Sequence, residues 1–352
     1  MMKKLIVVFC LIALSLQARA LPEWTVTGKY KKYPEIQYLT TLGIGSTKEA
    51  ADDQARGGIA KIFKAKIQEE SLTILNSTHQ YAKNGVQTHS EETMKEVTKV
   101  VTDKTLTGIE IKETISENLD DGSKRYYSLA VLDKIKMQSD LSSEILDIDK
   151  SIDSLVISAE AEKDLLKKIR YFSAAIPKIL KRNMLNGDLK IVDSSGIGIE
   201  PSKHTLSDLN SRLSNILTND FKVGINLEGN NVVSVQEALS EGLTREGFII
   251  EPDITKCSIT ITGNIELKKI DHPLNKEGWM IFQYSGSFQV VDPKTKNQYG
   301  SYPITGKATQ LSESAAREKA IENLKKDISD KVAVNISKVI FGNHEKTIEP
   351  NA

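Results

Sequence analysis

Histidine, cysteine and carboxylate side chains are the groups of this 352-residue chain that could bind a metal or catalyse a reaction. A structural zinc site needs histidines and cysteines at short, regular spacings, and neither the histidines nor Cys257 has such a neighbour. The acidic pairs Asp52-Asp53 and Asp120-Asp121 fall at an expected helix start and an expected turn, where solvated charge is their ordinary role. We therefore predict no metal site, no catalytic residues and no enzymatic activity. The histidines are His79, His89, His204, His272 and His344.

Gly43-Ile44-Gly45 lies between an expected strand and an expected helix, as the glycines of a dinucleotide-binding turn do. The third glycine of that motif would fall at position 48, which is lysine. We interpret the two glycines as a tight strand-to-helix turn and predict no cofactor.

Aromatic side chains are a better indication of function. Trp24, Tyr30, Tyr33 and Tyr38 lie close together in the sequence, among three lysines at positions 29, 31 and 32. Aromatic rings combined with cations are typical of a surface that contacts a partner protein. Alternatively, Trp24 covers one end of the first domain's sheet. Trp279 allows the same two interpretations, and we take these five aromatic residues as candidate partner contacts.

The first twenty residues have the three parts of a signal peptide: Lys3 and Lys4, an apolar run from position 5 to 16, and Ala18-Arg19-Ala20. We expect cleavage after Ala20 and export to the periplasm or cell surface. The apolar run is short for an uncleaved membrane anchor. Cys10 lies inside that run and follows Phe9, unlike a lipid-attachment cysteine, so we predict that it is removed.

Charge and cysteine content exclude further classes. The chain has 47 basic and 47 acidic residues. Three of the basic residues lie in the signal peptide, which leaves 44 against 47 and a net charge of −3 after cleavage. This balance gives no electrostatic reason to expect a nucleic-acid partner. Cys257 alone cannot form an internal disulfide, and no segment after the signal is apolar enough to span a membrane.

The first predicted domain covers residues 21–138. Its expected helix after Ser46-Thr47 has Ala51, Ala55, Ile59 and Phe63 at four-residue spacing, so its small residues can pack closely on a sheet. Residues 125–132 are apolar on both faces and predict a central strand. The predicted elements, in chain order, are a strand at 38–44, this helix, a strand at Leu72 and Ile74, a helix at 91–106, a strand at Ile109–Ile115, and the central strand.

Residues 139–186 repeat apolar residues in alternating steps of three and four, interrupted by Glu162 and Ser173. This heptad-like seam predicts either one long spacer helix or a folded-back helical hairpin, and Pro177 should kink or restart the helix. The seam must be buried by folding back on itself, by packing against a domain, or by pairing with a second copy. We favour packing within the chain and keep a homo-oligomer through this segment as the alternative.

The second predicted domain covers residues 187–342 and begins after Asn186-Gly187. We expect helices at 206–217 and 235–243, alternating strands at 259–267 and 282–290, a hairpin turn at 293–297, a final helix from Ser312 towards Val339, and a disordered tail at 343–352. The final helix repeats the pattern of the first at an offset of 265, with Ala316, Ala320 and Leu324 in the stripe. Two independent helices on sheets and two related modules both explain this repeat.

Several segments of the first domain resemble a known family. They are Pro22-Glu23-Trp24, Gly43-Ile44-Gly45-Ser46, Ala50-Ala51 with Ala55, Gly108-Ile109-Glu110-Ile111, Asp121-Gly122, and residues 126–132. Over about residues 22–138 the sequence resembles the Lpp-twenty lipoprotein family and the N-terminal domain of the flagellar ring protein FlgT. Residues 187–342 are similar in pattern to the TolB N-terminal domain and the FlgT middle domain. The resemblance implies an envelope protein with a small α/β fold.

These observations together predict an α+β protein: two mixed α/β domains, with helices packed on mainly antiparallel sheets, joined by a long helical segment. The function we expect is binding or assembly in the bacterial cell envelope, with other envelope proteins as partners and a flagellar or surface-structure association as one form of it. A periplasmic carrier of a small ligand or lipid is the alternative.

Overall fold

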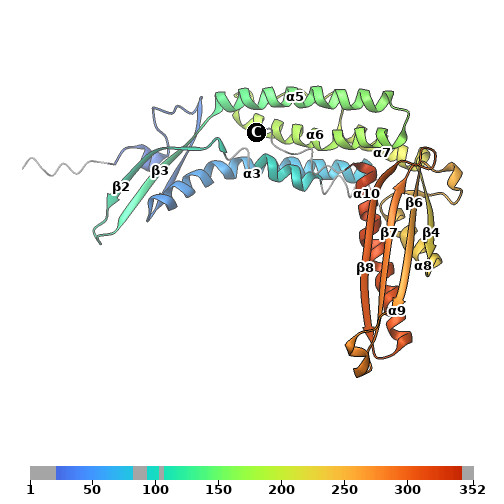
Figure 1. The fold of residues 1–352 in the computed structure, drawn as a ribbon. Coiled ribbons are helices and arrows are strands. Elements are labelled where there is room, and N and C mark those ends of the chain that lie inside the picture. The colour runs from blue at the N-terminus through green and yellow to red at the C-terminus, as the bar shows by residue number, and fades with distance from the viewer. Residues whose placement is uncertain (1–20, 82–92, 103–106, 343–352) are drawn as a thin grey trace, which may run out of the picture. The chain divides into compact units, whose positions relative to one another are not determined.

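The computed structural model describes residues 21–81, 93–102 and 107–342 (Figure 1). The predicted signal peptide, the predicted tail, His89 and His344 lie outside these residues. Contacts divide the chain into two compact units, which are described separately. The first contains the described residues up to Lys66 and within Thr102–Asp140, together with Asp188–Ile197. The second contains those within Ile67–Val101, Leu141–Gly187 and from Gly198 onward.

The first unit is built on a three-stranded antiparallel sheet. Its strands are β1 (Tyr38–Gly45), β2 (Glu110–Asn118) and β3 (Lys124–Asp133), in the order β1-β3-β2. β3 is buried continuously from Tyr127 to Leu132, which confirms the predicted central strand. β2 alternates between exposed and half-buried residues, as predicted for a strand with one solvated face.

One face of this sheet is covered by α3 (Lys48–Tyr81). Its stripe at Ala51, Ala55, Ile59 and Phe63 is fully buried, as predicted. The approach is close because β1 has a glycine there: a Cβ atom at Gly43 would lie 2.0 Å from the Ala51 carbonyl oxygen. The glycines at 43 and 45 therefore serve helix–strand contact within β1 instead of forming the predicted turn.

The strand predicted at Leu72 and Ile74 is wrong, because α3 continues to Tyr81. Ile67 is buried and extends the four-residue stripe by one more step. Two alternating residues are a weak strand signal beside that periodicity, and Leu72 is 63% exposed on the helix. The helix predicted at 91–106 is confirmed over residues 93–102, with Met94, Val97 and Val101 buried.

The predicted heptad segment forms two helices, α5 (Lys134–Ala161) and α6 (Leu165–Val192). They run antiparallel and side by side (Figure 1), joined by ion pairs from Lys181 to Glu144 at 2.9 Å and from Arg182 to Asp149 at 3.2 Å. Of the two alternatives for this segment, the structure therefore has the hairpin. The connection is a break at residues 162–164, where the Glu162 carboxylate accepts the backbone N–H groups of the next two residues.

Within α6 the chain departs from two sequence expectations. Of the kink or restart predicted at Pro177, the restart is wrong, because the helix continues through this residue. The helix also runs past the expected boundary at Asn186-Gly187 to Val192. Gly187 lies against α3, where an added Cβ would be 2.9 Å from the Glu70 Cγ. This glycine therefore serves close helix packing, not helix termination.

The seam of the hairpin is buried within the single chain. The buried seam residues are Leu141, Ile145, Ile152, Ala159, Leu166, Ile169, Ile176 and Leu180. On α6, Met184 also contacts the helix at 93–102 through a 3.7 Å approach of its Sδ to the Thr98 hydroxyl. This burial agrees with the preferred interpretation, packing within the chain.

The second unit also has a five-stranded mixed sheet in the order β5-β4-β6-β7-β8. The strands are β4 (Lys222–Gly229), β5 (Ile249–Ile250), β6 (Ile259–Lys269), β7 (Met280–Val291) and β8 (Gln298–Gln310). β4 pairs in parallel with β5 and β6, while β6–β7 and β7–β8 are antiparallel. The alternating strands and the hairpin turn were predicted, and β4 was missed.

Four helices accompany this sheet: α7 (Leu206–Asn215), α8 (Val232–Arg245), α9 (Glu313–Asp327) and α10 (Ala333–Phe341). A π-helical turn, Ile328–Val332, joins α9 to α10, so the predicted final helix is confirmed with one irregularity. α9 packs on β7 and β8 with Ala316, Ala320 and Leu324 buried. Across both units, the α+β class is confirmed. The described part of the chain contains no helix with the length and apolarity that crossing a bilayer requires.

Candidate functional site

The face of the first sheet opposite α3 is covered by the segment before β1. This segment begins with a short helix, α2 (Trp24–Thr27), which ends at Gly28 in the left-handed conformation. Trp24 is only 4% exposed and packs with Tyr127, Leu129 and Val131 of β3. Trp24 is thus buried and covers the sheet, which is the second of the two interpretations given for it above.

Three tyrosines continue from Trp24 as a row of edge-to-face rings. The Tyr30 and Tyr33 ring centroids are 6.0 Å apart, and those of Tyr33 and Tyr38 are 5.5 Å apart. The Tyr33 backbone N–H also donates to the Tyr30 carbonyl at 2.8 Å, so the backbone between them is held in a bridge. All three rings are partly buried against the core cluster of Trp24. The row is therefore fixed both by packing on the core and by the backbone hydrogen bond within its own loop.

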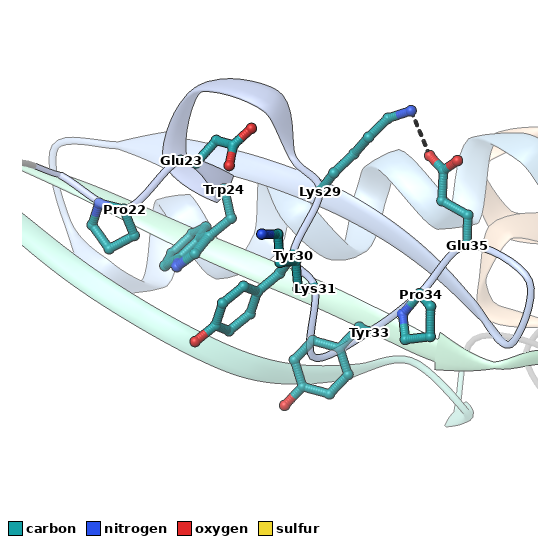
Figure 2. A pocket seen from close by; sticks show the side chains of 9 residues that line it. All are labelled: Pro22, Glu23, Trp24, Lys29, Tyr30, Lys31, Tyr33, Pro34 and Glu35. Atoms are coloured by element: carbon teal, nitrogen blue, oxygen red, sulfur yellow. Dashed lines mark ion pairs between the residues drawn. The ribbon is translucent and has the colours of Figure 1, made fainter.

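An open pocket of about 460 Å³ lies over this row (Figure 2). Its apolar lining combines aromatic rings with two prolines, and its polar lining combines lysines with glutamates. The lining residues are Pro22, Glu23, Trp24, Lys29, Tyr30, Lys31, Tyr33, Pro34 and Glu35. We call it the N-terminal pocket.

Charge around the N-terminal pocket is partly neutralised. Lys29 pairs with Glu35 at 2.7 Å. Lys32 pairs with Glu113 of β2 at 2.9 Å and lies 5.3 Å from the centre of the Tyr33 ring. The hydrogen bond from Lys32 to Glu113 raises the pKa of this lysine above its ordinary value. Lys31 is exposed, and within the described residues it has no ion pair.

The structure brings together four of the five predicted contact residues. Trp24, Tyr30 and Tyr33 line the N-terminal pocket, and Tyr38 on β1 contacts the Tyr33 ring edge-to-face. Trp279 belongs to the second unit, at the start of β7, and is 36% exposed.

Glu113, which holds Lys32 in place, was not predicted, because nothing in the sequence relates positions 81 residues apart. Pro22 and Pro34 also line the pocket and were not among the predicted contact residues. The signal in the sequence that could have indicated them is their position beside an aromatic-rich run.

The groups that could have carried chemistry have structural partners. Among the described residues, no three histidine, cysteine or acidic side chains are placed to hold a metal. His204 lies 3.2 Å from Asp153, and the His272 side chain caps a 3-10 turn at Pro273–Glu277. Cys257 is buried, and burial raises the pKa of its thiol.

Asp52 differs from the prediction of solvated charge. It is only 8% exposed and accepts hydrogen bonds from Ser128 at 2.5 Å and Lys48 at 2.6 Å. Burial alone would raise its pKa, but the bonds from Lys48 and Ser128 outweigh burial and lower it. This carboxylate links α3 to the sheet.

A three-stranded antiparallel sheet with one long helix across it, and an aromatic N-terminal segment on the other face, defines the class of the first domain as a small α+β module. Residues 22–133 match the model of the LPP20 lipoprotein family. This match confirms the resemblance to the Lpp-twenty family drawn from the sequence.

Three solved structures illustrate the structural similarities. A minor lipoprotein from Acinetobacter baumannii is 14% identical and covers 33% of this chain and 94% of its own, with a TM-score of 0.26. A neuraminyllactose-binding hemagglutinin homologue from Helicobacter pylori is 20% identical and covers 37% and 87%, with a TM-score of 0.25. A secreted protein from Helicobacter pylori is 12% identical and covers 85% and 97%, with a TM-score of 0.36.

These TM-scores are all below 0.5, and we draw no conclusion about function from them. The comparison with curated proteins finds no significant match.

Proposed function

We propose that this chain is an exported, non-catalytic protein of the cell envelope that binds another envelope component through the N-terminal pocket. The observation that carries the proposal is the pocket itself, an aromatic and lysine-lined hollow in the segment that matches a lipoprotein family. Tyrosine, tryptophan and cationic groups around a depression are the composition of protein-binding hot spots.

The pocket is suited to binding because its rings are already ordered. Trp24 is fixed by the β3 core, and Tyr33 is held by its backbone bridge to Tyr30 and by its neighbour Tyr38. A ligand therefore does not need to immobilise these side chains, which would otherwise cost about 0.5–1.5 kcal/mol for each one. The titratable groups described above serve ion pairs and caps, and this supports binding in preference to catalysis.

Export follows from the predicted signal, and the proposal places the cleaved N-terminus beside the pocket. Leu21, the first residue after the expected cleavage site, packs on the Trp24 cluster. N-terminal sequencing of protein recovered from the periplasmic or surface fraction should begin at Leu21. A first residue at Cys10 carrying a lipid would contradict both the cleavage and the soluble export.

Site-specific photo-crosslinking in the native cell tests the binding proposal directly. A benzoyl-phenylalanine at Tyr30 should give a discrete crosslinked product. The matched control carries the same probe at Lys61, an exposed residue of α3 on the opposite face of the sheet. Products that are the same at both positions, or absent at both, would remove the pocket as a partner site.

The second candidate is a carrier of a small ligand or lipid, and the size of the pocket is the observation that favours it. About 460 Å³ falls within the range of roughly 300–1,000 Å³ typical of ligand sites. Native mass spectrometry of the purified chain distinguishes the two. A stoichiometric small molecule that is lost with Tyr30→Ala would support the carrier, and a bare chain would support the partner-binding protein.

Two narrower proposals concern assembly. A flagellar or surface-structure role rests on the resemblance to FlgT, and motility of a deletion strain tests it.

A homo-oligomer through residues 139–186 would require the buried seam to open. Light scattering of the chain and of an Ile148→Asp, Ile152→Asp variant tests this point: a dimer that becomes a folded monomer would support oligomerisation, and a monomer that unfolds would support packing within the chain.

A further inference from the structure

The apolar faces of the N-terminal pocket lie in a line. Figure 2 shows Pro22, Trp24, Tyr30, Tyr33 and Pro34 following one another across the site. Because Trp24 is only 4% exposed, the faces open to a ligand are those of the two tyrosines and the two prolines. A compact ligand is best enclosed by faces that surround it on several sides. A line of separate ring faces instead matches a linear ligand whose apolar groups recur along its length.

Some polar groups beside this line already have partners within the chain: Lys29 pairs with Glu35, and the Tyr33 hydroxyl donates to Glu113 at 3.4 Å. The Tyr30 and Tyr33 hydroxyls point to the same side of the row, away from the Glu23 carboxylate (Figure 2). The Glu35 carboxylate is already occupied by Lys29. Tyr30 and Lys31 side chains make no hydrogen bond or ion pair within the described residues. Among the lining side chains, the Tyr30 hydroxyl and the Lys31 ammonium are therefore free donors, and Glu23 is a free carboxylate on the other side of the row.

We propose that the N-terminal pocket takes an extended, proline-rich segment of an envelope protein in the polyproline II conformation, with an acidic residue that pairs with Lys31. This inference rests on the proposed function and names its ligand. A polyproline II segment has no internal hydrogen bonds, so its carbonyl groups are free acceptors. Proline itself brings no N–H donor, and its ring packs on aromatic faces, which is how aromatic-lined grooves recognise such segments.

The alternative linear ligand, a glycan strand, fits the lining less well. A sugar chain carries hydroxyl groups that donate as often as they accept, and burying donors without acceptors is unfavourable. The row offers too few free carboxylates or amides to satisfy them. Order also favours the peptide, because a preformed polyproline II chain and a preformed aromatic row lose little conformational entropy on binding.

Fluorescence anisotropy of a labelled peptide tests the proposal on the chain as it is purified. The probe is a synthetic peptide of Glu-Pro-Pro repeats, and the matched peptide has Glu-Ala-Ala repeats of equal length and charge. Chitotetraose serves as the glycan. We expect saturable binding of the Glu-Pro-Pro peptide only, weakened about tenfold by Tyr30→Ala and weakened by Lys31→Glu more strongly at low salt than at high salt.

Lys61→Glu is the charge-matched control and should leave binding unchanged. Equal binding of the two peptides, insensitivity to Tyr30→Ala in a variant that retains its folded Trp24 fluorescence, or displacement by chitotetraose would each overturn the ligand assignment. A Tyr30 crosslink to a partner without peptide binding would refute the proline-rich ligand and leave the proposed function standing. Absence of both would refute the two proposals together.

Discussion

Thr47 and Ser312 play the same part at the start of α3 and α9. Each hydroxyl accepts the backbone N–H three residues further on, from Ala50 at 3.1 Å and from Ala315 at 3.3 Å. In both helices the residues that follow at four-residue spacing begin with two fully buried alanines. Judged by cap and stripe alone, the two helices are equivalent.

Their sheets meet them differently. α3 lies directly on strand backbone, because Gly43 has no side chain to separate the two. Opposite α9, a tyrosine ring fills the space: Tyr284 of β7 lies over its cross-strand partner Gly306, and its hydroxyl donates to Asp327 of α9 at 2.5 Å.

The comparison shows that a stripe of small residues determines which face of a helix is buried, whereas the facing strand determines how closely it packs. The two glycines make room for different neighbours: Gly43 for the backbone of α3, and Gly306 for the ring of Tyr284. Both interpretations of this repeat, two related modules and two independent helices on sheets, stay predictions.

The largest expected effect comes from Gly43→Ala. Its Cβ would meet the Ala51 carbonyl oxygen at 2.0 Å and the Ala55 nitrogen at 2.4 Å, and neither backbone atom can move without shifting the helix. We expect a loss of about 3 kcal/mol or more in the unfolding free energy of the first unit. Urea unfolding followed through Trp24, in a Trp279→Phe background, measures it.

Gly306→Ala is the matched change in the second unit. Its Cβ would meet the Tyr284 ring, a side chain that can rotate away at the cost of its bond to Asp327. The expected loss is smaller, about 1–2 kcal/mol, followed through Trp279 in a Trp24→Phe background. Equal losses at the two glycines would mean that the two interfaces do not differ as described.

The next effect is overpacking of the stripes themselves. Ala51→Leu and Ala316→Leu each add three carbon atoms to a fully buried position, and each should cost about 1–3 kcal/mol. The cost should be greater at Ala51, where the helix faces backbone, than at Ala316. A melting temperature unchanged by either substitution would refute the burial of that helix face.

Much of the fold could be predicted because it depends on local periodicity. The alanine stripes, the central strand β3 and the alternation of β6 and β7 all follow from burial repeating at the period of a helix or strand. The errors come from contacts between distant residues. Gly187 resembles a helix end in sequence, but it is interior to α6 because Glu70 of α3 packs there.

The candidate site was predictable in composition and not in arrangement. The sequence groups Trp24, Tyr30, Tyr33 and Tyr38, since they are neighbours along the chain. It could not indicate that Trp24 is buried while the tyrosines remain partly open, because that distinction depends on which residues β3 offers beneath them. The bond between Lys32 and Glu113 depends in the same way on strand pairing.

A smaller effect should follow from removing the caps. Thr47→Ala and Ser312→Ala each leave one backbone N–H of the first turn without its side-chain acceptor, which costs about 1 kcal/mol. If the two helices are as alike at their starts as their geometry indicates, the losses should agree within error. Thr47→Ser and Ser312→Thr are conservative controls that should keep most of the stability. A loss at one helix only would break the equivalence of the two starts.

The smallest effect tests the close approach of α3 at single-residue resolution. Gly57 and Gly58 are adjacent in the middle of this helix, where glycine is less favourable than alanine by about 0.5–1 kcal/mol. A Cβ at Gly57 would meet nothing within 4 Å, so Gly57→Ala should stabilise the first unit by about that amount. A Cβ at Gly58 would lie 2.9 Å from the Thr41 Cβ, and the Thr41 hydroxyl is bonded to the Ala55 carbonyl at 2.5 Å. Gly58→Ala should therefore lose its helical gain to this contact and be the less stable of the two. The two substitutions lie in the same helix and add the same methyl group. The difference between their unfolding free energies, followed through Trp24, therefore measures the contact of position 58 with β1. Equal stabilisation by both would show that α3 does not lie against β1 at this point.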